Sequence, residues 1–434
     1  MKNEKTIGKE RLLAFFDAGT FVELGAYIRR PGSDDTEGVV CGYGAKDGRL
    51  VFAFSQDPSQ MRGALDARHA EKIALTYQKA LAVGAPIVGF FDCAGVAVFD
   101  GAAALAGYGT LLSVAAKAAG KIPQIAVISG VCAGTMAAVA ALFDLTIVIK
   151  EKSLLYTASP SLVGEEIGTA EYAAKNGNAA LVAASESEAF AAAGKLISYL
   201  PDRAGGNLPT YAGDDLNRAL AIADGVSAAD ALAAAVDAGS FTALYADYSD
   251  TVTAGIAFMG GIPAVALALD GELTLSGVKA MTRLYALAES FGLPTVTFVN
   301  CEGTAKDEQP ELAVALAALA KALANGTAAR VTAIVGKAIG AGFLFGGAKT
   351  LGADMVYALP GAEISTLTAK TGVAFLWNDR ITAEKTREDL EKEWSEAAAP
   401  EAAAAMGEVD DIVEPAELRA RVLAALMMLR DKRA

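Results

Sequence analysis

Residues 84–95 read GAPIVGFFDCAG, and residues 292–303 read GLPTVTFVNCEG. The second stretch follows the first at an offset of 208 residues and repeats its proline, its cysteine and its final glycine in the same places. An apolar run that ends in a glycine turn is typical of a strand buried on both faces of a parallel sheet. The match therefore predicts a duplicated domain in which this strand and its turn occur twice.

The repeat reaches beyond these two strands. Each half has a pattern that indicates a hairpin, at residues 39–54 and 254–270, followed by alternating helical and strand patterns. Further matches support the duplication: Tyr77 with Tyr285, Ala133-Gly134 with Ala341-Gly342, and DAGTF at 17–21 with DAGSF at 237–241. A length of 434 residues suits two domains. We place them at residues 1–215 and 216–434, joined within the Pro- and Gly-rich stretch 201–225.

The composition narrows the classes of function. The formal net charge is −14 and there is no basic stripe, which argues against nucleic acid as a partner. A single histidine, His69, and four cysteines without metal-ligand spacing argue against a metal site or a histidine-based triad. The charged start shows no secretory signal, and the uncharged run 122–143 suits a buried strand and a small-residue helix better than a membrane span. We expect a cytoplasmic protein without a metal.

Each half also carries a second glycine turn, within AVISGVCAGTM in the first half and TAIVGKAIGAGFLF in the second. Such a turn leads a strand into a helix whose first N–H groups have no partner inside the helix. Two amides that face one carbonyl oxygen form an oxyanion hole, in which each donor contributes roughly 3–4 kcal/mol. The alternative is that the glycines only let the helix pack closely on the strand. The doubling of the turns favours the oxyanion hole; the glycines are Gly95 with Gly134, and Gly303 with Gly342.

Other ligand sites fit the sequence less well. The run 342–350 resembles a phosphate-binding P-loop, but an alanine separates its last glycine from Lys349. No GxGxxG follows a predicted strand, which argues against a dinucleotide site. Asp92 and Asn300 end equivalent strands, and we expect them to form turns rather than to act as bases. Two oxyanion holes without a general base suit a reaction through enolates, in which substrate or cofactor takes the proton.

The blocks resemble the carboxyltransferase subunits of biotin-dependent acyl-CoA carboxylases and of sodium-pumping acyl-CoA decarboxylases. The similar stretches cover nearly the whole chain in the family's order. In the first half they are VFAFSQDPSQMRGALDARHAEKI, GAPIVGFFDCAG and IPQIAVISGVCAG; in the second half they are LPTVTFVN, VGKAIGAGF, GADMVYALPGAEIS and GEVDDIVEPAELRARVLAAL. The resemblance implies an α/β protein of two tandem crotonase-like β-β-α superhelix domains.

The resemblance also implies which residues act. Acyl-CoA would bind mainly to the first domain and carboxybiotin mainly to the second. The implied residues are, for the thioester oxygen, the amides of Gly134 and Thr135 with Gly95 and Val96 beside them, and, for the ureido oxygen of biotin, the amides of Ala341 and Gly342 with Gly303 and Leu344 beside them. The position of Leu344 tends to set acyl size in the family, and an aliphatic residue there suits a small acyl group.

The partners follow from the same resemblance. No biotin-attachment motif occurs in the sequence, so biotin would arrive on a partner, a biotin carboxyl carrier protein. A biotin carboxylase or a membrane decarboxylase subunit would complete the complex. Family members assemble as homo-oligomers, usually hexamers, with active sites between protomers.

The chain departs from the family pattern after its first repeated strand. Ala97 stands where the family has an arginine, and Thr135 replaces the second glycine of the turn. Two rival functions therefore stay open: a non-catalytic scaffold subunit of such a complex, and another crotonase-type acyl-CoA enzyme, for which Glu165 and Glu166 are the nearest carboxylates. The acyl group and the direction of transfer stay open as well.

Overall fold

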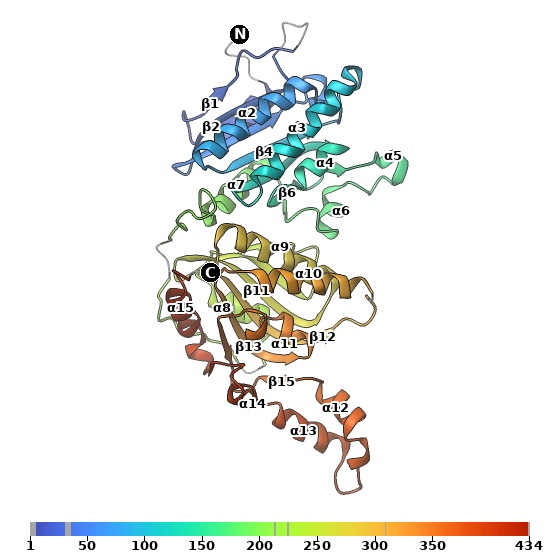
Figure 1. The fold of residues 1–434 in the computed structure, drawn as a ribbon, viewed down its shortest axis with the longest axis vertical. Coiled ribbons are helices and arrows are strands. Elements are labelled where there is room, and N and C mark those ends of the chain that lie inside the picture. Colours follow the sequence, from blue (N-terminus) through green and yellow to red (C-terminus); the bar gives the residue numbers. More distant parts are fainter. Residues whose placement is uncertain (1–5, 31–35, 212–213, 224, 309, 433–434) are drawn as a thin grey trace. The chain divides into compact units, whose positions relative to one another are not determined.

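The computed structural model of the chain describes every residue except 1–5, 31–35, 212–213, 224, 309 and 433–434. The first five residues of the charged start and parts of the join at 201–225 thus lie outside the described residues. The chain divides into two compact units, Met1–Asn207 and Leu208–Ala434, and the division falls within that join. Figure 1 shows the elements of each unit.

Unit 1 is built on a sheet with the strand order β1-β2-β3-β4-β5-β6-β8, and β7 pairs with the far end of β5. The first three strands are antiparallel and the later pairs are parallel. The strands are β1 (Val22–Leu24), β2 (Val39–Lys46), β3 (Arg49–Gln56), β4 (Ile87–Cys93), β5 (Gln124–Ala133), β6 (Leu145–Ile149), β7 (Leu154–Tyr156) and β8 (Leu181–Ala183). The helices are α1 (Ile7–Phe15), α2 (Ala67–Val83), α3 (Ala102–Ala118), α4 (Thr135–Ala140), α5 (Pro160–Val163), α6 (Ala170–Lys175) and α7 (Glu186–Tyr199).

Unit 2 repeats this topology with the order β9-β10-β11-β12-β13-β14-β16, and β15 pairs with β13. Its strands are β9 (Thr242–Leu244), β10 (Val252–Met259), β11 (Ile262–Leu273), β12 (Thr295–Thr304), β13 (Arg330–Ile339), β14 (Met355–Ala358), β15 (Glu363–Ser365) and β16 (Asp411–Ile412). Its helices are α8 (Ala228–Ala235), α9 (Leu275–Phe291), α10 (Glu311–Asn325), α11 (Ala341–Phe345), α12 (Ala369–Leu376), α13 (Arg387–Ala397), α14 (Pro400–Ala405) and α15 (Leu418–Met428). The shared strand order confirms the predicted duplication.

The same short motif closes the hairpin of each unit. In unit 1 the carboxylate of Asp17 accepts the N–H groups of Asp47 and Gly48 at 3.0 and 2.9 Å, in the turn between β2 and β3. In unit 2 the carboxylate of Asp237 accepts those of Gly260 and Gly261 at 2.9 and 2.8 Å. An aspartate suits this task because two oxygens can satisfy two turn amides at once. The match of residues 17–21 with 237–241 thus has a structural basis.

The first long helix of each unit begins and ends in the same way. Asp66 caps α2 by accepting the N–H of His69, and Thr274 caps α9 through its hydroxyl. Gly84 and Gly292 end these helices with φ of 68° and 67°, a conformation that glycine adopts at little cost. The glycine and proline that open both repeated stretches are therefore a helix end followed by the entry into the next strand.

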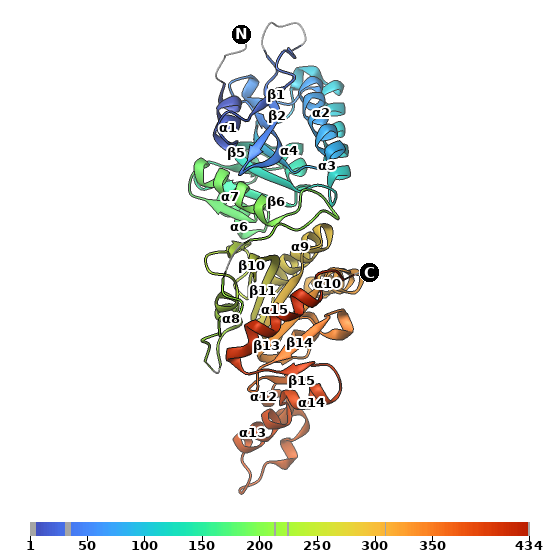
Figure 2. The same ribbon diagram turned by 90° about the vertical axis from the view of Figure 1, so that its left-hand side faces the viewer.

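Helices cover both faces of each sheet, which explains the apolar parallel strands. In unit 1, α2 and α3 lie side by side on one face and α1 and α7 lie on the other (Figure 2). The core under α2 and α3 includes Tyr77, Leu111 and Phe143, all buried. In unit 2, α9 and α10 pair in the same way, while α8 and α15 pack on the opposite face around Leu232, Val422 and Phe298.

Candidate active site

The ends of two parallel strands meet at one edge of the sheet in each unit. In unit 1, Cys93 of β4 lies opposite Cys132 of β5 after a register shift. In unit 2, Cys301 of β12 lies opposite Ala338 of β13 after the same kind of shift. Because parallel neighbours end at the same edge, the turns that follow them leave the sheet side by side. The fold thus brings together the two glycine turns predicted for each half.

The first turn of unit 1, residues 94–97, is clamped by the segment that leads into α2. The N–H of Leu65 donates to the carbonyl of Gly95 at 2.9 Å, and the N–H of Ala97 donates to the carbonyl of Leu65 at 2.8 Å. Gly95 has a φ of 118°, which excludes most other residues. The N–H groups of Gly95 and Val96 donate to no described residue. They are therefore available as hydrogen-bond donors to a ligand.

The second turn of unit 1 ends at Gly134, the N-cap of α4, with a φ of 63°. Its own N–H donates to the carbonyl of Tyr156 on β7 at 2.8 Å. The predicted donor role of the Gly134 amide is therefore corrected, because β7 already uses this N–H. The free donor is the N–H of Thr135, which as the first residue of the helix has no partner inside it. A methyl group added to Gly134 would meet no atom within 4 Å, so the space in front of the turn is open.

Unit 2 builds the same turn, but two residues earlier than the repeat offset predicts. Gly340 is the N-cap of α11 with a φ of 52°, and its N–H donates to the carbonyl of Ser365 on β15 at 2.8 Å. The structural counterpart of Gly134 is thus Gly340, and the predicted pairing with Gly342 is wrong. Ala341 takes the place of Thr135 as the first residue of the helix.

Gly342 has a packing role. A methyl group there would lie 2.7 Å from the carbonyl oxygen of Cys301, so only glycine lets α11 approach the end of β12 this closely. Gly342 corresponds to Met136, the second residue of α4, which is fully buried. Leu344, two residues further along α11, is 44% exposed. It lies on the same short helix as the free amide of Ala341.

The first turns of the two units agree in detail. Gly303 has a φ of 121°, close to that of Gly95. In both units the thiol of the preceding cysteine donates to the glycine carbonyl, Cys93 to Gly95 at 3.3 Å and Cys301 to Gly303 at 3.5 Å. Burial raises the pKa of each of these thiols to about 11. They are therefore protonated near neutral pH and support the turn, which argues against a nucleophilic role.

Asp92, next to last in β4, and Asn300, in the middle of β12, hold the bulge that precedes the second turn. Asp92 accepts the N–H of Val131 at 3.2 Å, and Asn300 accepts the N–H of Lys337 at 3.0 Å. The second carboxylate oxygen of Asp92 accepts a hydrogen bond from the buried guanidinium of Arg11 at 2.8 Å. Because both oxygens are in use, Asp92 is a structural residue and not a base. The predicted turn-forming role is wrong, because Asp92 lies within β4 and Asn300 within β12, where each supports the neighbouring strand.

The open ends of the two turn pairs differ in charge. In unit 2 the ammonium of Lys337 pairs with Glu302 at 2.6 Å, and both side chains are partly exposed, at 41% and 45%. In unit 1 the corresponding residues are Val131 and Ala94, which carry no charge. This difference was not predicted from the sequence, because Lys337 and Glu302 lie in two separate quoted stretches and only the strand register brings them together. The register of the bulge, set by Asn300, is the feature that places Lys337 there.

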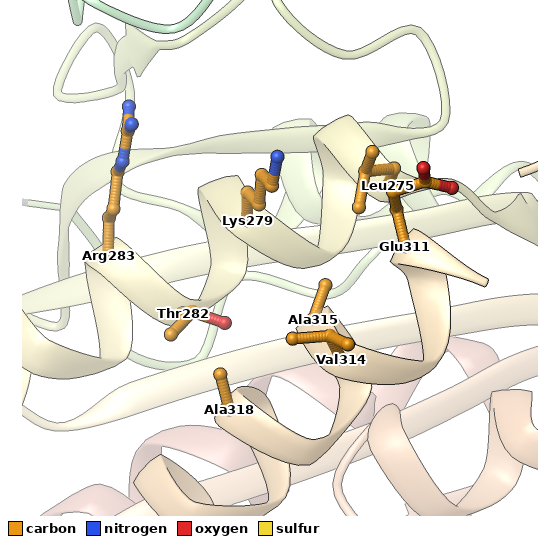
Figure 3. A pocket seen from close by; sticks show the side chains of 8 residues that line it. All are labelled: Leu275, Lys279, Thr282, Arg283, Glu311, Val314, Ala315 and Ala318. Atoms are coloured by element: carbon orange, nitrogen blue, oxygen red, sulfur yellow. The ribbon is translucent and has the colours of Figure 1, made fainter. Parts of the chain in front are cut away.

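A groove of about 490 Å³ lies between α9 and α10 of unit 2 (Figure 3). Its floor is mostly apolar, with Ala315 and Ala318 from α10, while Lys279 and Arg283 from α9 stand at its rim. None of the predicted site residues lines this groove. Glu165 and Glu166, the carboxylates that a hydratase-type reaction would need, are exposed in the segment between α5 and α6.

The described residues form neither a metal-ligand cluster nor a helix of membrane-spanning character. No group of three or more histidine, cysteine, aspartate or glutamate side chains in this part of the chain is arranged to hold a metal ion. No helix formed by these residues has both the length and the apolar character of a membrane span. The uncharged run 122–143 forms β5 and α4 instead, as the sequence predicts.

Comparison with known proteins identifies the family. The chain matches the carboxyl transferase domain over residues 1–434. It belongs to the carboxyl transferase domain family.

Members of the family that resemble this chain are known by their activities. The chain is 30% identical over 473 residues to a propionyl-CoA carboxylase carboxyltransferase subunit from Haloferax mediterranei, covering 99% of this chain and 91% of the relative. It is 31% identical over 470 residues to the methylmalonyl-CoA decarboxylase subunit alpha of Veillonella parvula, with the same coverage. A crystal structure of transcarboxylase 12S, a hexamer with methylmalonyl-CoA and methylmalonic acid bound, aligns with a TM-score of 0.92, at 28% identity, over 100% of this chain and 91% of the other.

These likenesses test two predictions from the sequence. The resemblance to biotin-dependent carboxyltransferase subunits is confirmed by the family match and by the relatives. The two tandem crotonase-like domains are confirmed by the duplicated sheets and by the alignment with a carboxyl transferase family structure over the whole chain.

Proposed function

We propose that this protein is a carboxyltransferase subunit that moves a carboxyl group between biotin on a partner protein and a short-chain acyl-CoA. The observation that carries the proposal is the doubled turn pair. In each unit a strand-end turn and a helix start present amides at one sheet edge, with the N-cap glycine locked by β7 or β15. One enzyme with two such sites suits a reaction in which two carbonyl-type oxygens must bear negative charge.

We assign the acyl-CoA to the first half. The N–H of Thr135, together with those of Gly95 and Val96, would donate to the thioester oxygen while the α-carbon carries negative charge. Helix α4 spans only six residues, so its dipole is small and each amide acts mainly as an individual donor. Each preorganised donor of this kind typically lowers the barrier by roughly 3–4 kcal/mol.

We assign biotin to the second half. The N–H of Ala341 would donate to the ureido oxygen, and Gly303 with its positive φ keeps the adjoining turn open. The ammonium of Lys337 stands at the mouth of this turn pair and suits a carboxylate. Bound biotin supplies the ureido nitrogen that carries the carboxyl group and exchanges the α-proton of the acyl group. Such chemistry needs no protein carboxylate as base, in keeping with the structural role of Asp92.

The relatives favour a small acyl group. Two of the relatives similar to this chain over nearly its whole length are a propionyl-CoA carboxylase subunit and a methylmalonyl-CoA decarboxylase subunit. We therefore propose propionyl-CoA and methylmalonyl-CoA, or acyl groups of similar size, as the substrate pair. A biotin carboxyl carrier protein and either a biotin carboxylase or a membrane decarboxylase subunit would be the partners.

Free biotin can replace the carrier in a direct test. Purified protein is incubated with malonyl-, methylmalonyl- or glutaconyl-CoA, with and without biotin, and loss of the carboxyl group is followed by chromatography. Decarboxylation that requires biotin supports the proposal. Turnover of acyl-CoA without any need for biotin indicates another crotonase-type enzyme. No turnover of any carboxyacyl-CoA, by a protein that is folded, indicates the scaffold subunit.

The assembly has a test of its own. We propose a homo-hexamer, on the likeness to transcarboxylase 12S, whose structure is a hexamer assembly. Light scattering of the purified protein should then give about six times the 44.3 kDa mass of one chain. A monomer at micromolar concentration would contradict the hexamer.

A further inference from the structure

The turn before α2 contains two consecutive residues in a backbone conformation that side chains disfavour. Met61 and Arg62 have φ of 46° and 56°. In the described part of the chain, three other non-glycine residues have positive φ, and each of them is isolated in the sequence: Asp47, Glu151 and Tyr245. Strained backbone of this kind persists only where the surroundings enforce it, and it concentrates at ligand sites.

This strained backbone contacts the first turn of unit 1, residues 94–97, which we assign to the acyl-CoA site. The carbonyl of Arg62 accepts the N–H of Ala94 at 3.0 Å, so the strained turn is bonded directly to the first residue after β4. Gly63 presses on the same strand end, because a methyl group there would lie 2.0 Å from the carbonyl oxygen of Asp92. Residues 61–63 are therefore bonded to, and packed against, the segment that leads from β4 into the turn with Gly95.

The side chain of Arg62 has no structural partner among the described residues. It is exposed, and its guanidinium has no hydrogen bond or ion pair with any described residue. Arg11 and Arg419, in contrast, are buried in ion pairs with Asp92 and Asp237. Arg30 adds a second cation, since its guanidinium contacts the sulfur of Met61.

We propose that Arg62 is an anion-binding residue for the acyl-CoA. Its guanidinium would take an anionic oxygen of that ligand, either on a phosphate of the CoA or on the carboxylate of the carboxyacyl group. Glycine would adopt these φ values without strain, so a positive charge is what the chain gains from arginine at this position. This inference rests on the proposed function, because it presumes that acyl-CoA occupies the first half.

The test compares two glycine substitutions that relieve the same kind of strain. Arg62→Gly removes the charge, and Met61→Gly serves as the matched control that keeps it. Dissociation constants for CoA and for malonyl-CoA are measured by calorimetry, and melting temperatures by circular dichroism. We expect both variants to melt at or above the wild-type temperature, because glycine relaxes the turn. We expect Arg62→Gly alone to weaken binding, by about ten- to a hundredfold.

The two ligands separate the two sources of the anion. Weaker binding of both CoA and malonyl-CoA by Arg62→Gly indicates a phosphate, and weaker binding of malonyl-CoA alone indicates the carboxylate. Wild-type affinity of Arg62→Gly for both ligands overturns the inference and leaves the proposed function standing. Equal losses in Arg62→Gly and Met61→Gly also overturn it, because the geometry of the turn and not the charge would then matter. A wild-type protein that binds neither ligand contradicts the proposed function itself, and the inference with it.

Discussion

The two halves of the chain share the backbone structure of the two glycine turns and differ in the side chains around those turns. Both clamp a glycine turn with a leucine before the first long helix, support it with a cysteine thiol, and lock the second turn through an N-cap glycine. These features fix where free amides lie. Their persistence in both halves shows that the fold itself produces the turn pair, whatever the ligand.

The differences lie behind and in front of the turns. Behind them, unit 1 uses the charged pair Arg11 and Asp92, whereas unit 2 uses the neutral Asn300, whose amide donates to Asp270 at 3.3 Å. In front of them, unit 2 carries the pair Lys337 and Glu302, and unit 1 carries no charge at the same positions. The comparison teaches that the same pair of turns can be stabilised in two ways and can bind two different ligands. Substitutions behind and in front of the turns, in each unit, test this conclusion.

The largest effect is expected from breaking the buried charge pair. Arg11→Met leaves the carboxylate of Asp92 without its cation in a buried place, and such a loss costs about 3–5 kcal/mol. Asn300→Ala, the matched change in unit 2, removes a neutral group and should cost about 1–2 kcal/mol. Urea denaturation measures both, by circular dichroism for the chain and by tryptophan fluorescence for unit 2, since Trp377 and Trp394 both belong to it.

Two outcomes decide this comparison. Adding Asp92→Asn to Arg11→Met should recover part of the loss, because the unpaired charge disappears. Equal costs for Arg11→Met and Asn300→Ala would contradict the view that the halves differ in how they hold the bulge.

The next effect concerns the N-cap glycines. Gly134→Val and Gly340→Val each place a branched side chain at a positive φ, which shifts the following amide out of position. We expect turnover to fall by about 10²–10³ in each case, with a loss of stability of about 1–3 kcal/mol. The biotin-dependent decarboxylation assay gives a KM for each ligand. The KM for malonyl-CoA tests the site in the first half, and the KM for biotin tests the site in the second half.

Alanine in place of valine at the same two glycines is a milder change, and it tests which ligand each half binds. Gly134→Ala should raise the KM for malonyl-CoA more than that for biotin, and Gly340→Ala should do the reverse. If both variants change the same KM, the assignment of one ligand to each half is wrong.

Much of this backbone structure is predictable from sequence because its signals are local. The glycine turns, the hairpins and the helix ends depend on residues a few positions apart, such as Gly84 after α2. The two-residue shift of Gly340 was predictable too, since Gly130 and Gly134 have the same spacing as Gly336 and Gly340. The strand register, which places each of these pairs at a bulge and an N-cap, makes that spacing the relevant signal.

The parts that escaped prediction depend on contacts over long distances. Arg11 lies 81 residues before Asp92, and no local pattern marks it as a partner. The strained conformation of Arg62 is equally invisible in sequence, because Met and Arg are not turn formers. In both cases the packing of distant segments against the end of β4 decides the conformation.

A smaller effect is expected from the ion pair of Lys337 and Glu302 in front of the turns of unit 2. Lys337→Met removes the cation that we assign to the carboxylate at the biotin site, and should raise the KM for biotin in carboxyl transfer by about tenfold. Its stability should stay within about 1 kcal/mol of wild type, because the pair with Glu302 is partly exposed. Val131→Met, the matched change in unit 1, should leave both KM values unchanged. An unchanged KM for biotin in Lys337→Met would show that the pair is only a surface contact.

The smallest effect is a difference in pH dependence between the halves. Unit 1 buries His69 on α2, where burial lowers its pKa from 6.5 to about 3, and unit 2 has Gly277 at the same position of α9. Below pH 6.5 the unfolded chain binds a proton at His69 that the folded chain does not bind. The contribution of His69 to the free energy of unfolding is therefore complete above pH 6.5 and is lost as the pH falls. The loss amounts to about 1 kcal/mol between pH 6.5 and about 5.5.

Asp144 opposes this trend, and a variant separates the two groups. Burial raises the pKa of Asp144 to about 7, so its folded carboxyl binds a proton that the unfolded chain releases, and it favours the folded state as the pH falls. The net slope of the wild type is therefore small. His69→Leu removes only the histidine contribution, so its free energy of unfolding should rise relative to wild type by about 1 kcal/mol over the same interval. Parallel pH profiles for wild type and His69→Leu would contradict the lowered pKa of His69, because a histidine with the same pKa in the folded and unfolded chain adds nothing to the slope.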